Sequence, residues 1–302
     1  MNLWGQKMIT LNDLKSHKPK YNFFIGIDSD GTVFDTMNLK HSYCFVDSLV
    51  SIYNLSKIRS EVVKLWKKIN LYSKYRGINR FEALYIFFEN FKKNKDFEKN
   101  QNSFPNLKVI KNLSELNIPL TNENLLKFSK NYSKKNQELN DIERAIIWSK
   151  DVNKNVEKLI IDLPPIQGAV TAIKYLYNHS DMAVLSNTPA KTLLNDWNQN
   201  NIKNLVSFIC GQETGSKTEM LKAAIKRKYD RDKVMMIGDS PSDFYAAKNN
   251  NALFFPIIPG SENDSWNFLV NEGIPSFFSL KYRSKIQKEK IIEFESSINA
   301  KL

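Results

Sequence analysis

Hydrophobic and polar positions divide the chain into two kinds of pattern. In residues 36–163, apolar side chains recur every three or four positions, as at Leu39, Tyr43 and Val46, which predicts amphipathic helices. Before and after this segment, short apolar runs alternate with helical patterns, which predicts a parallel sheet covered by helices. We therefore predict an α/β fold: a Rossmann-like doubly wound parallel sheet core with an inserted all-helical domain.

The same pattern gives the expected elements. Strands are predicted at 23–27, 182–185, 206–210, 234–237 and 253–257. Helices are predicted in the core at 169–177, 190–199, 218–228, 243–249, 264–271 and after 281, and in the inserted segment at 39–50, 62–69, 81–88, from 121 and at 141–161. Residues 92–120, rich in Asn and Lys with single prolines, are predicted to be a long loop with little regular structure.

These elements predict a discontinuous core domain. Residues 1–35 supply its first strand, residues 36–163 form the inserted helical domain, and residues 164–302 complete the core, with a helical extension from about 260. The first strand has to join the later ones, because a lone strand could not bury its apolar faces.

Polar clusters follow the apolar runs of the predicted core. Asp28 and Asp30 come directly after the first run, and Gly31 next to them permits a sharp turn. Because ligands of open α/β sheets bind at the carboxyl ends of the strands, these carboxylates are placed for chemistry. Asp28 could act as a nucleophile, and Asp30 could protonate a leaving oxygen and later deprotonate water.

A divalent cation is needed if two carboxylates face a phosphate dianion, and oxygen ligands suit Mg²⁺. Asp239, after the run VMMIG, would supply a further carboxylate. Lys217 could neutralise negative charge on the nucleophile and the phosphoryl group, while Ser186 and the backbone around Asn187 could bind its non-bridging oxygens.

Together these stretches resemble the four ordered motifs of the haloacid dehalogenase superfamily. They are DSDGT at 28–32, Ser186-Asn187, Lys217 and GDSPSD at 238–243. The resemblance implies a helical C1 cap and a Mg²⁺ site. It also implies that Asp28 is the nucleophile and a metal ligand, and that Asp30 is the acid/base and a metal ligand through its backbone carbonyl. Asp239 would be a further metal ligand, and Asp243 and Thr32 would support the site. Ser186 and Asn187 would bind the phosphate, and Lys217 would neutralise negative charge.

An acid at position 30 favours a phosphatase or a phosphomutase of this superfamily, because dehalogenases and phosphonatases generally lack it. We predict a Mg²⁺-dependent phosphatase that hydrolyses a small phosphorylated metabolite, with a phosphomutase as the alternative. In the inserted domain, Arg76 and Arg80 lie four residues apart around Gly77 and could bind a second anionic group of the substrate. Ordinary surface arginines beside a helix start are the other interpretation.

Composition adds few further constraints. The excess of 44 basic over 32 acidic residues, net +12, attracts anions, so a non-catalytic anion- or nucleic-acid-binding protein is a second class of function. The lysines are scattered without interleaved arginine and aromatic residues, which argues against nucleic acid. The sequence shows neither a signal peptide nor a membrane span, and its two cysteines lie far apart, so we predict a cytoplasmic protein with free thiols.

The stretch GQETGSKT at 211–218 is similar to a nucleotide-binding P-loop but has the wrong spacing. That motif places four residues between its glycines and Lys directly after the second one. Here three residues separate Gly211 from Gly215, and Ser216 precedes Lys217.

Overall fold

The computed structural model describes residues 8–94, 104–116, 120–130, 136–159, 163–283 and 285–299. The chain folds into two compact units. Unit 1 contains Met1–Thr36 and Asp162–Asn299, and unit 2 is built on Met37–Ile161. These divisions lie next to the domain boundaries predicted at 35/36 and 163/164.

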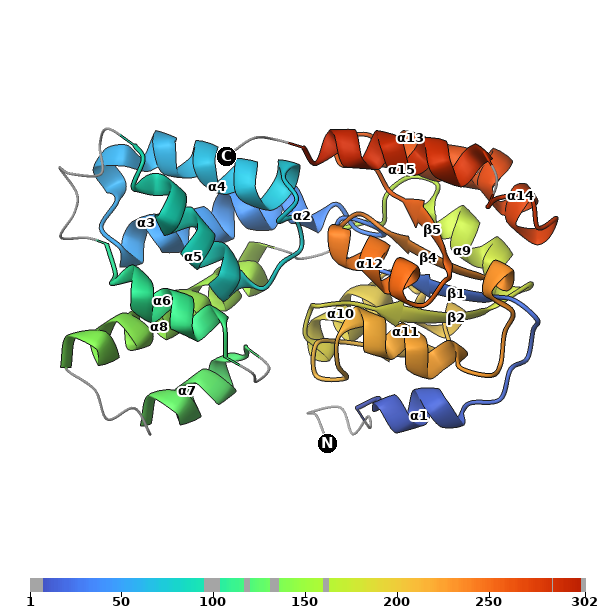
Figure 1. Ribbon diagram of the computed structural model, residues 1–302, viewed down its shortest axis with the longest axis horizontal. Coiled ribbons are helices and arrows are strands. Elements are labelled where there is room, and N and C mark those ends of the chain that lie inside the picture. Colours follow the sequence, from blue (N-terminus) through green and yellow to red (C-terminus); the bar gives the residue numbers. More distant parts are fainter. Residues whose placement is uncertain are drawn as a thin grey trace. The chain divides into compact units, whose positions relative to one another are not determined.

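Unit 1 is organised around a five-stranded parallel sheet in the order β3-β2-β1-β4-β5 (Figure 1). The strands are β1 Phe24–Ile27, β2 Asp181–Leu185, β3 Phe208–Cys210, β4 Val234–Gly238 and β5 Leu253–Pro256. Phe24 pairs with Asp181 on one side and with Val234 on the other, so β1 is the central strand. The predicted α/β fold with a parallel sheet is confirmed.

Helices cover both faces of this sheet, because successive side chains of a strand point to opposite sides. Ile25 and Ile27 enter one core together with α9 (Ala169–Tyr177), α10 (Ala190–Gln199) and Trp266. Phe24 enters the other, together with α11 (Lys217–Ile225) and α12 (Pro241–Asn249), which Figure 1 shows on one side of the strands. Burial on both faces explains why the strands read as continuous apolar runs.

Helices near the two ends of the described chain add to the hydrophobic cores on the two faces of the sheet. Helix α1 (Leu11–Ser16) places Leu14 in the same core as α11, and α15 (Lys285–Ser297) adds Phe294 to it. Helices α13 (Glu262–Phe268) and α14 (Ile274–Phe278) pack on the opposite core and are joined by a π-helical turn, Leu269–Gly273.

Unit 2 is helical in its described residues. Its helices are α2 (Thr36–Leu39, beginning at the last residue of unit 1), α3 (Val46–Ile52), α4 (Arg59–Tyr72), α5 (Arg80–Phe91), α6 (Leu107–Ser114), α7 (Asn122–Lys130) and α8 (Asn136–Leu159). Trp66, Phe87 and Trp148 lie in its hydrophobic core. A π-helical turn, Lys40–Phe45, precedes α3.

The predicted long loop at 92–120 is wrong for its central part, where α6 forms. Asn106 caps the helix by accepting a hydrogen bond from the backbone N–H of Lys108, and Val109, Ile110 and Leu113 are buried. The helical apolar spacing is present, but intervening Lys and Asn residues obscured it. Residues 95–103 and 117–119 of the predicted loop lie outside the described residues.

Within the part of the chain that the structure describes, every helix is too short or too polar to cross a lipid bilayer. Cys44 and Cys210 are both free thiols and both buried.

Candidate active site

The loop after β1 carries the first two aspartates. Asp28 follows β1 directly and still makes a sheet-like hydrogen bond to β4. Its backbone N–H donates to the carbonyl of Ile237 at 2.9 Å. Gly31 adopts a φ of 78°, a left-handed conformation that favours glycine, so the chain turns back at once. The N–H groups of Val33 and Phe34 then donate to the carbonyl of Ser29. The loop therefore leaves Asp28 at the carboxyl edge of the central strand.

Two fully buried tryptophans hold this loop in place. The indole N–H of Trp197 donates to Ser29 Oγ over 3.0 Å, and that of Trp266 donates to the carbonyl of Thr32 over 2.8 Å. Because each ring is also packed in the core, the two ends of the turn are fixed to the body of unit 1.

Lys217 lies between two carboxylates. Ser216 and Glu219 form a capping box that starts α11 at Lys217. From there, Lys217 Nζ reaches Asp28 Oδ2 at 2.7 Å and Asp243 Oδ1 at 2.8 Å, with all three side chains buried. The stretch that is similar to a P-loop is thus a loop that leads into α11, whose first residue supplies the ammonium group.

The end of β4 and the start of α12 supply two more carboxylates. Asp239 Oδ1 accepts a hydrogen bond from Thr32 Oγ1 at 3.0 Å, which links the loops after β1 and β4. Asp243 Oδ2 accepts from the N–H and the hydroxyl of Ser240, in a capping box that starts α12. Gly238 is needed beside them, since a Cβ there would lie 2.2 Å from Asp243 Cγ.

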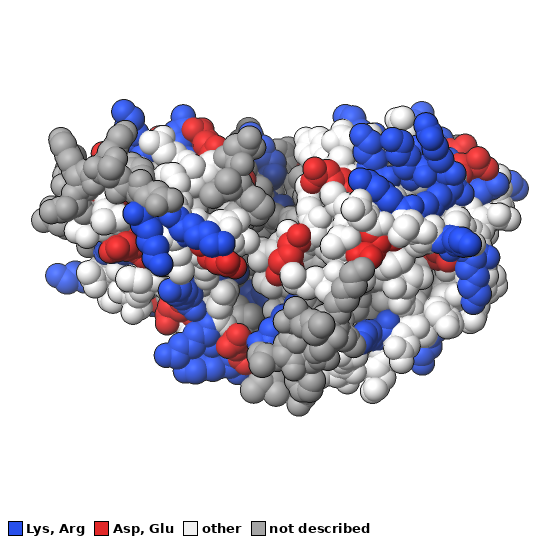
Figure 2. All heavy atoms as spheres, turned by 90° about the horizontal axis from the view of Figure 1, so that it is seen from below, with Lys and Arg blue, Asp and Glu red and all other residues white. Residues whose placement is uncertain are grey.

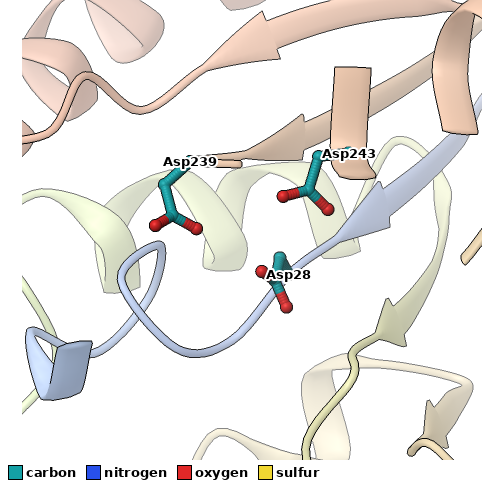
Figure 3. A group of neighbouring side chains, drawn as sticks. All are labelled: Asp28, Asp239 and Asp243. Carbon is teal, nitrogen blue, oxygen red and sulfur yellow. The ribbon is translucent and has the colours of Figure 1, made fainter. Parts of the chain in front are cut away.

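The carboxylates of Asp28, Asp239 and Asp243 converge (Figure 3). One oxygen of each lies within 4.8 Å of the others, and all three side chains are buried. Lys217 contacts two of these three carboxylates, those of Asp28 and Asp243, so these four side chains together carry an excess of negative charge when all three aspartates are ionised. Carboxylate oxygens crowded in this way are a donor set that fits a hard divalent cation such as Mg²⁺.

Burial and neighbouring charges shift the pKa values of these groups. Burial raises the pKa of Asp28 to about 8, although Lys217 acts to lower it. Burial likewise raises the pKa of Asp243, again against the effect of Lys217. For Lys217 burial opposes the charge, but Asp243 and Asp28 outweigh it and raise the pKa. The ammonium of Lys217 is therefore charged, whereas the pKa of Asp28 stays raised even beside that ammonium.

Two hydroxyl groups bind the carboxylate of Asp30. Thr36 Oγ1 donates to Asp30 Oδ1, and Thr188 Oγ1 donates to Asp30 Oδ2, each over 2.5 Å. Thr36 comes from the chain leaving unit 1, and Thr188 from the loop after β2. Both carboxylate oxygens thus accept hydrogen bonds, which restrict the orientation of the Asp30 side chain.

The loop after β2 brings the second predicted cluster to the same edge of the sheet. Ser186 is buried, and its N–H donates to the carbonyl of Cys210, whereas Asn187 is exposed. Ser186 Oγ accepts from the N–H of Thr188 at 3.3 Å. Gly211 permits this loop to lie close to β3, because a Cβ there would be 2.7 Å from the carbonyl oxygen of Thr188.

The two arginines predicted for substrate choice differ in their surroundings. Arg76 is buried, and its Nη1 donates to the carbonyl of Leu71 at the end of α4. Arg80 is the first residue of α5 and is partly buried, with its Nη1 bonded to Ser149 and Asn153. Their role in binding a substrate stays a prediction.

Several residues of the site gave no signal in the sequence. Thr36 and Thr188 bind Asp30, yet threonine is common in loops and neither position belonged to a predicted polar pair. Trp197 and Trp266 support the loop after β1 from α10 and α13, although in the sequence they appear as ordinary core residues. Only the folded arrangement brings them to the loop.

The sequence profile described as haloacid dehalogenase-like hydrolase matches residues 78–256, which is more than half of the chain. The chain belongs to this hydrolase family. The resemblance predicted from the four motifs is confirmed. The matched segment begins after Asp28 and Asp30, so the geometry of the first loop is an independent observation.

Solved structures with similar folds are more distant. A hydrolase from Pseudomonas syringae is 16% identical, with 84% of this chain and 98% of that chain covered and a TM-score of 0.46. A predicted phosphoglycolate phosphatase from Haemophilus somnus is 13% identical, with 78% of this chain and 84% of that chain covered and a TM-score of 0.45. A predicted phosphatase from Clostridium acetobutylicum is 14% identical, with 78% of this chain and 85% of that chain covered and a TM-score of 0.41. At these values the likeness carries no information on activity or substrate. A search of curated proteins finds no significant match to this chain.

Proposed function

We propose that this hydrolase is a Mg²⁺-dependent phosphatase that cleaves a small phosphorylated metabolite through an aspartyl-phosphate intermediate. The observation that carries the proposal is the position of Asp28: its carboxylate lies at the edge of the central strand, 2.7 Å from the ammonium of Lys217 and beside two further buried carboxylates. Unit 2 is, in this proposal, the cap domain predicted from the sequence.

In the first step, a carboxylate oxygen of Asp28 attacks the phosphorus atom, and the bond to the ester oxygen breaks. Asp30, in its protonated form, gives its proton to the departing alcohol oxygen. The ammonium of Lys217 offsets negative charge on Asp28 and on the phosphoryl group, and Ser186 with the backbone N–H groups near Asn187 would bind the non-bridging oxygens.

In the second step, water attacks the phosphorus of the aspartyl phosphate. Asp30, now ionised, takes a proton from that water, and the bond between phosphorus and the Asp28 oxygen breaks to release inorganic phosphate. The hydroxyls of Thr36 and Thr188 would hold the Asp30 side chain in position for both proton transfers. The carboxylate of Asp28 is regenerated.

Asp28 and Asp239, with the backbone carbonyl of Asp30, would hold Mg²⁺, and Asp243 would support them through Lys217 and Ser240. Bound there, the ion would offset the negative charge of the phosphate and favour the ionised form of the nucleophile. The raised pKa of Asp28 supports the need for such a cation. Thr32 would orient Asp239 through its hydroxyl.

The experiment is the release of inorganic phosphate from p-nitrophenyl phosphate and a panel of sugar, nucleotide and small-acid phosphates, with Mg²⁺ and with EDTA. We expect metal-dependent turnover by the wild-type protein and none above the blank for Asp28→Asn, because the nucleophile is lost. Asp264→Asn, a change of the same kind at an exposed position of α13, should retain full activity.

Folded protein that releases no phosphate from any compound would contradict the phosphatase proposal. Conversion of one phosphate ester into its isomer without phosphate release would instead support a phosphomutase. Figure 2 shows basic side chains gathered densely in one area, so binding to nucleic acid is a third outcome to test. A nucleic-acid-binding protein would have an affinity for nucleic acid that falls steeply with salt concentration and does not depend on Asp28.

A further inference from the structure

The loop 211–216, which joins β3 to α11, is bonded to the loop after β2. The N–H of Gln212 donates to the carbonyl of Thr188 at 3.1 Å. The next residue, Glu213, accepts with its Oε2 from the N–H of Ala190 at 3.0 Å. The stretch that is similar to a P-loop thus includes two residues that bind a neighbouring loop.

Glu213 takes the place of an N-cap residue for α10. Ala190 is the first residue of this helix, and the N–H groups of a first helical turn have no partner within the helix. The N-cap residue is Pro189, whose side chain makes no capping hydrogen bond. A carboxylate suits this position, since the start of a helix carries a partial positive charge. The start of α10 is therefore capped from another loop.

Thr188 is the residue that this arrangement fixes. Its carbonyl is bonded to one residue of loop 211–216, and Ala190, two positions on, is bonded to the next. The N–H of Thr188 donates to Ser186 Oγ, and its hydroxyl donates to Asp30 Oδ2. A shift of Ala190 would therefore move the residue that joins the predicted phosphate ligand to the predicted acid/base.

The loop 211–216 is itself held at both ends. On one side β3 pairs with β2 up to Cys210. On the other, Thr214 is buried and its Oγ1 donates to the carbonyl of Ile9 at 2.9 Å, while Ser216 caps α11. Glu213 thus belongs to a segment that is fixed to the body of unit 1.

The side chain of Glu213 contributes little to the packing of unit 1, because it is exposed. Among the residues that the structure describes, its one hydrogen-bonded partner is the N–H of Ala190, and no basic side chain forms an ion pair with it. Removal of this side chain should therefore uncap α10 and leave the hydrophobic cores intact. An effect on the reaction can then be separated from an effect on folding.

We propose that Glu213 is a positioning residue for the reaction. By binding the N–H of Ala190, it keeps the loop after β2 in the place where Thr188 binds Asp30. The inference rests on the proposed function, because the proton transfers of Asp30 are what this loop serves.

The first arm of the test measures kcat/KM for phenyl phosphate and for p-nitrophenyl phosphate with Mg²⁺. We expect Glu213→Ala to lower kcat/KM for phenyl phosphate by roughly three- to tenfold, the effect of one hydrogen bond of modest strength. The loss for p-nitrophenyl phosphate should be smaller, because its leaving group is a weaker base and depends less on a proton donor. Glu213→Gln keeps an oxygen acceptor and should restore most of the activity. Glu295→Ala, the same change at an exposed position of α15, is the matched control.

A double variant tests whether Glu213 acts through Thr188. Thr188→Val already removes the hydroxyl that binds Asp30, so adding Glu213→Ala should lower kcat/KM by no more than about a further twofold. Melting curves establish that each variant folds. Losses that multiply in the double variant would overturn the proposal, as would a folded Glu213→Ala protein with wild-type kcat/KM for both esters.

The second arm needs no turnover. It measures amide hydrogen exchange of peptides that span residues 186–192, by mass spectrometry, in the full-length protein. We expect faster exchange there in Glu213→Ala and unchanged exchange in Glu295→Ala. A wild-type protein that hydrolyses neither ester would count against the proposed function. Equal exchange in Glu213→Ala and wild type would show that Glu213 does not hold this loop, and would overturn the proposal whether or not the protein hydrolyses the esters.

Discussion

At the scale of single residues, the site depends on side chains whose charges are set by their neighbours. Asp28 and Asp30 are two positions apart in the sequence, yet one lies beside an ammonium and further carboxylates and the other between two threonine hydroxyls. Burial raises the pKa of the first, whereas both carboxylate oxygens of the second accept hydrogen bonds from hydroxyl groups. This difference in environment supports assigning them different roles.

Thr188 should act as a positioning residue for Asp30. Thr188→Val removes the hydrogen bond to Asp30 Oδ2 and leaves a side chain of similar size. Because hydrogen bonds to charged groups contribute about 1.5–3 kcal/mol, we expect kcat to fall by roughly 10- to 150-fold with a small change in KM. Steady-state kinetics on p-nitrophenyl phosphate measure this effect.

Thr188→Ser is the control, because it keeps the hydroxyl and should restore most of kcat. Equal kcat values for the Val variant and the wild-type protein would show that this hydrogen bond does not matter for turnover.

At the scale of elements, helix starts and close backbone approaches place the charged groups. Capping boxes fix the first turns of α11 and α12, from which Lys217 and Asp243 reach each other. Gly238, the last residue of β4, leaves room for the Asp243 carboxylate. The sequence predicted both helices within two residues of their observed starts, but α6 was missed because its apolar positions lie among Lys and Asn.

Alanine substitutions of two strand glycines should separate an effect on activity from an effect on stability. In Gly238→Ala the new Cβ would lie 2.2 Å from Asp243 Cγ, so the carboxylate or the strand has to move. In Gly26→Ala it would lie 2.8 Å from Met236 Sδ, in a flexible side chain that can adjust. Phosphatase assays and urea unfolding should show both proteins less stable by about 1–3 kcal/mol, with activity lost only in Gly238→Ala.

The two variants are matched, because both add one methyl group to a parallel strand of the same sheet. Full activity in Gly238→Ala would mean that the position of Asp243 is not critical for the reaction.

At the scale of the whole molecule, folding gathers like charges that repel one another. Asp28, Asp239 and Asp243 come from two strand ends and a helix, and their convergence in a buried place costs free energy that the hydrophobic cores of unit 1 offset. A cation that binds only the folded state would recover part of this cost and stabilise unit 1.

Thermal unfolding should therefore respond to Mg²⁺. At 100 times the dissociation constant, a bound ion adds about 2.7 kcal/mol, which raises Tm by roughly 5–10 °C for a unit of this size. Asp239→Asn should remove most of this rise. The same variant should be no less stable than wild type in EDTA, because it removes one of the repelling charges. Scanning calorimetry with and without Mg²⁺ measures both effects.

Asp264→Asn serves as the control and should keep the full response. An equal rise in Tm for Asp239→Asn would place the stabilising ion elsewhere in the protein.

The sequence by itself determined the fold class, the family and the main charged residues of the candidate site. It could do so because continuous apolar runs specify buried parallel strands, and because Asp28, Asp239 and Asp243 directly follow such runs or begin the next helix. Only the tertiary structure decided that Thr36 and Thr188 bind Asp30, and that Trp197 and Trp266 anchor the loop after β1. It also showed that Arg80 is partly buried and bonded to α8, whereas Arg76 is buried and bonded to the end of α4. Such contacts join residues that are distant along the chain, and local patterns of polarity carry no information about which of them will meet.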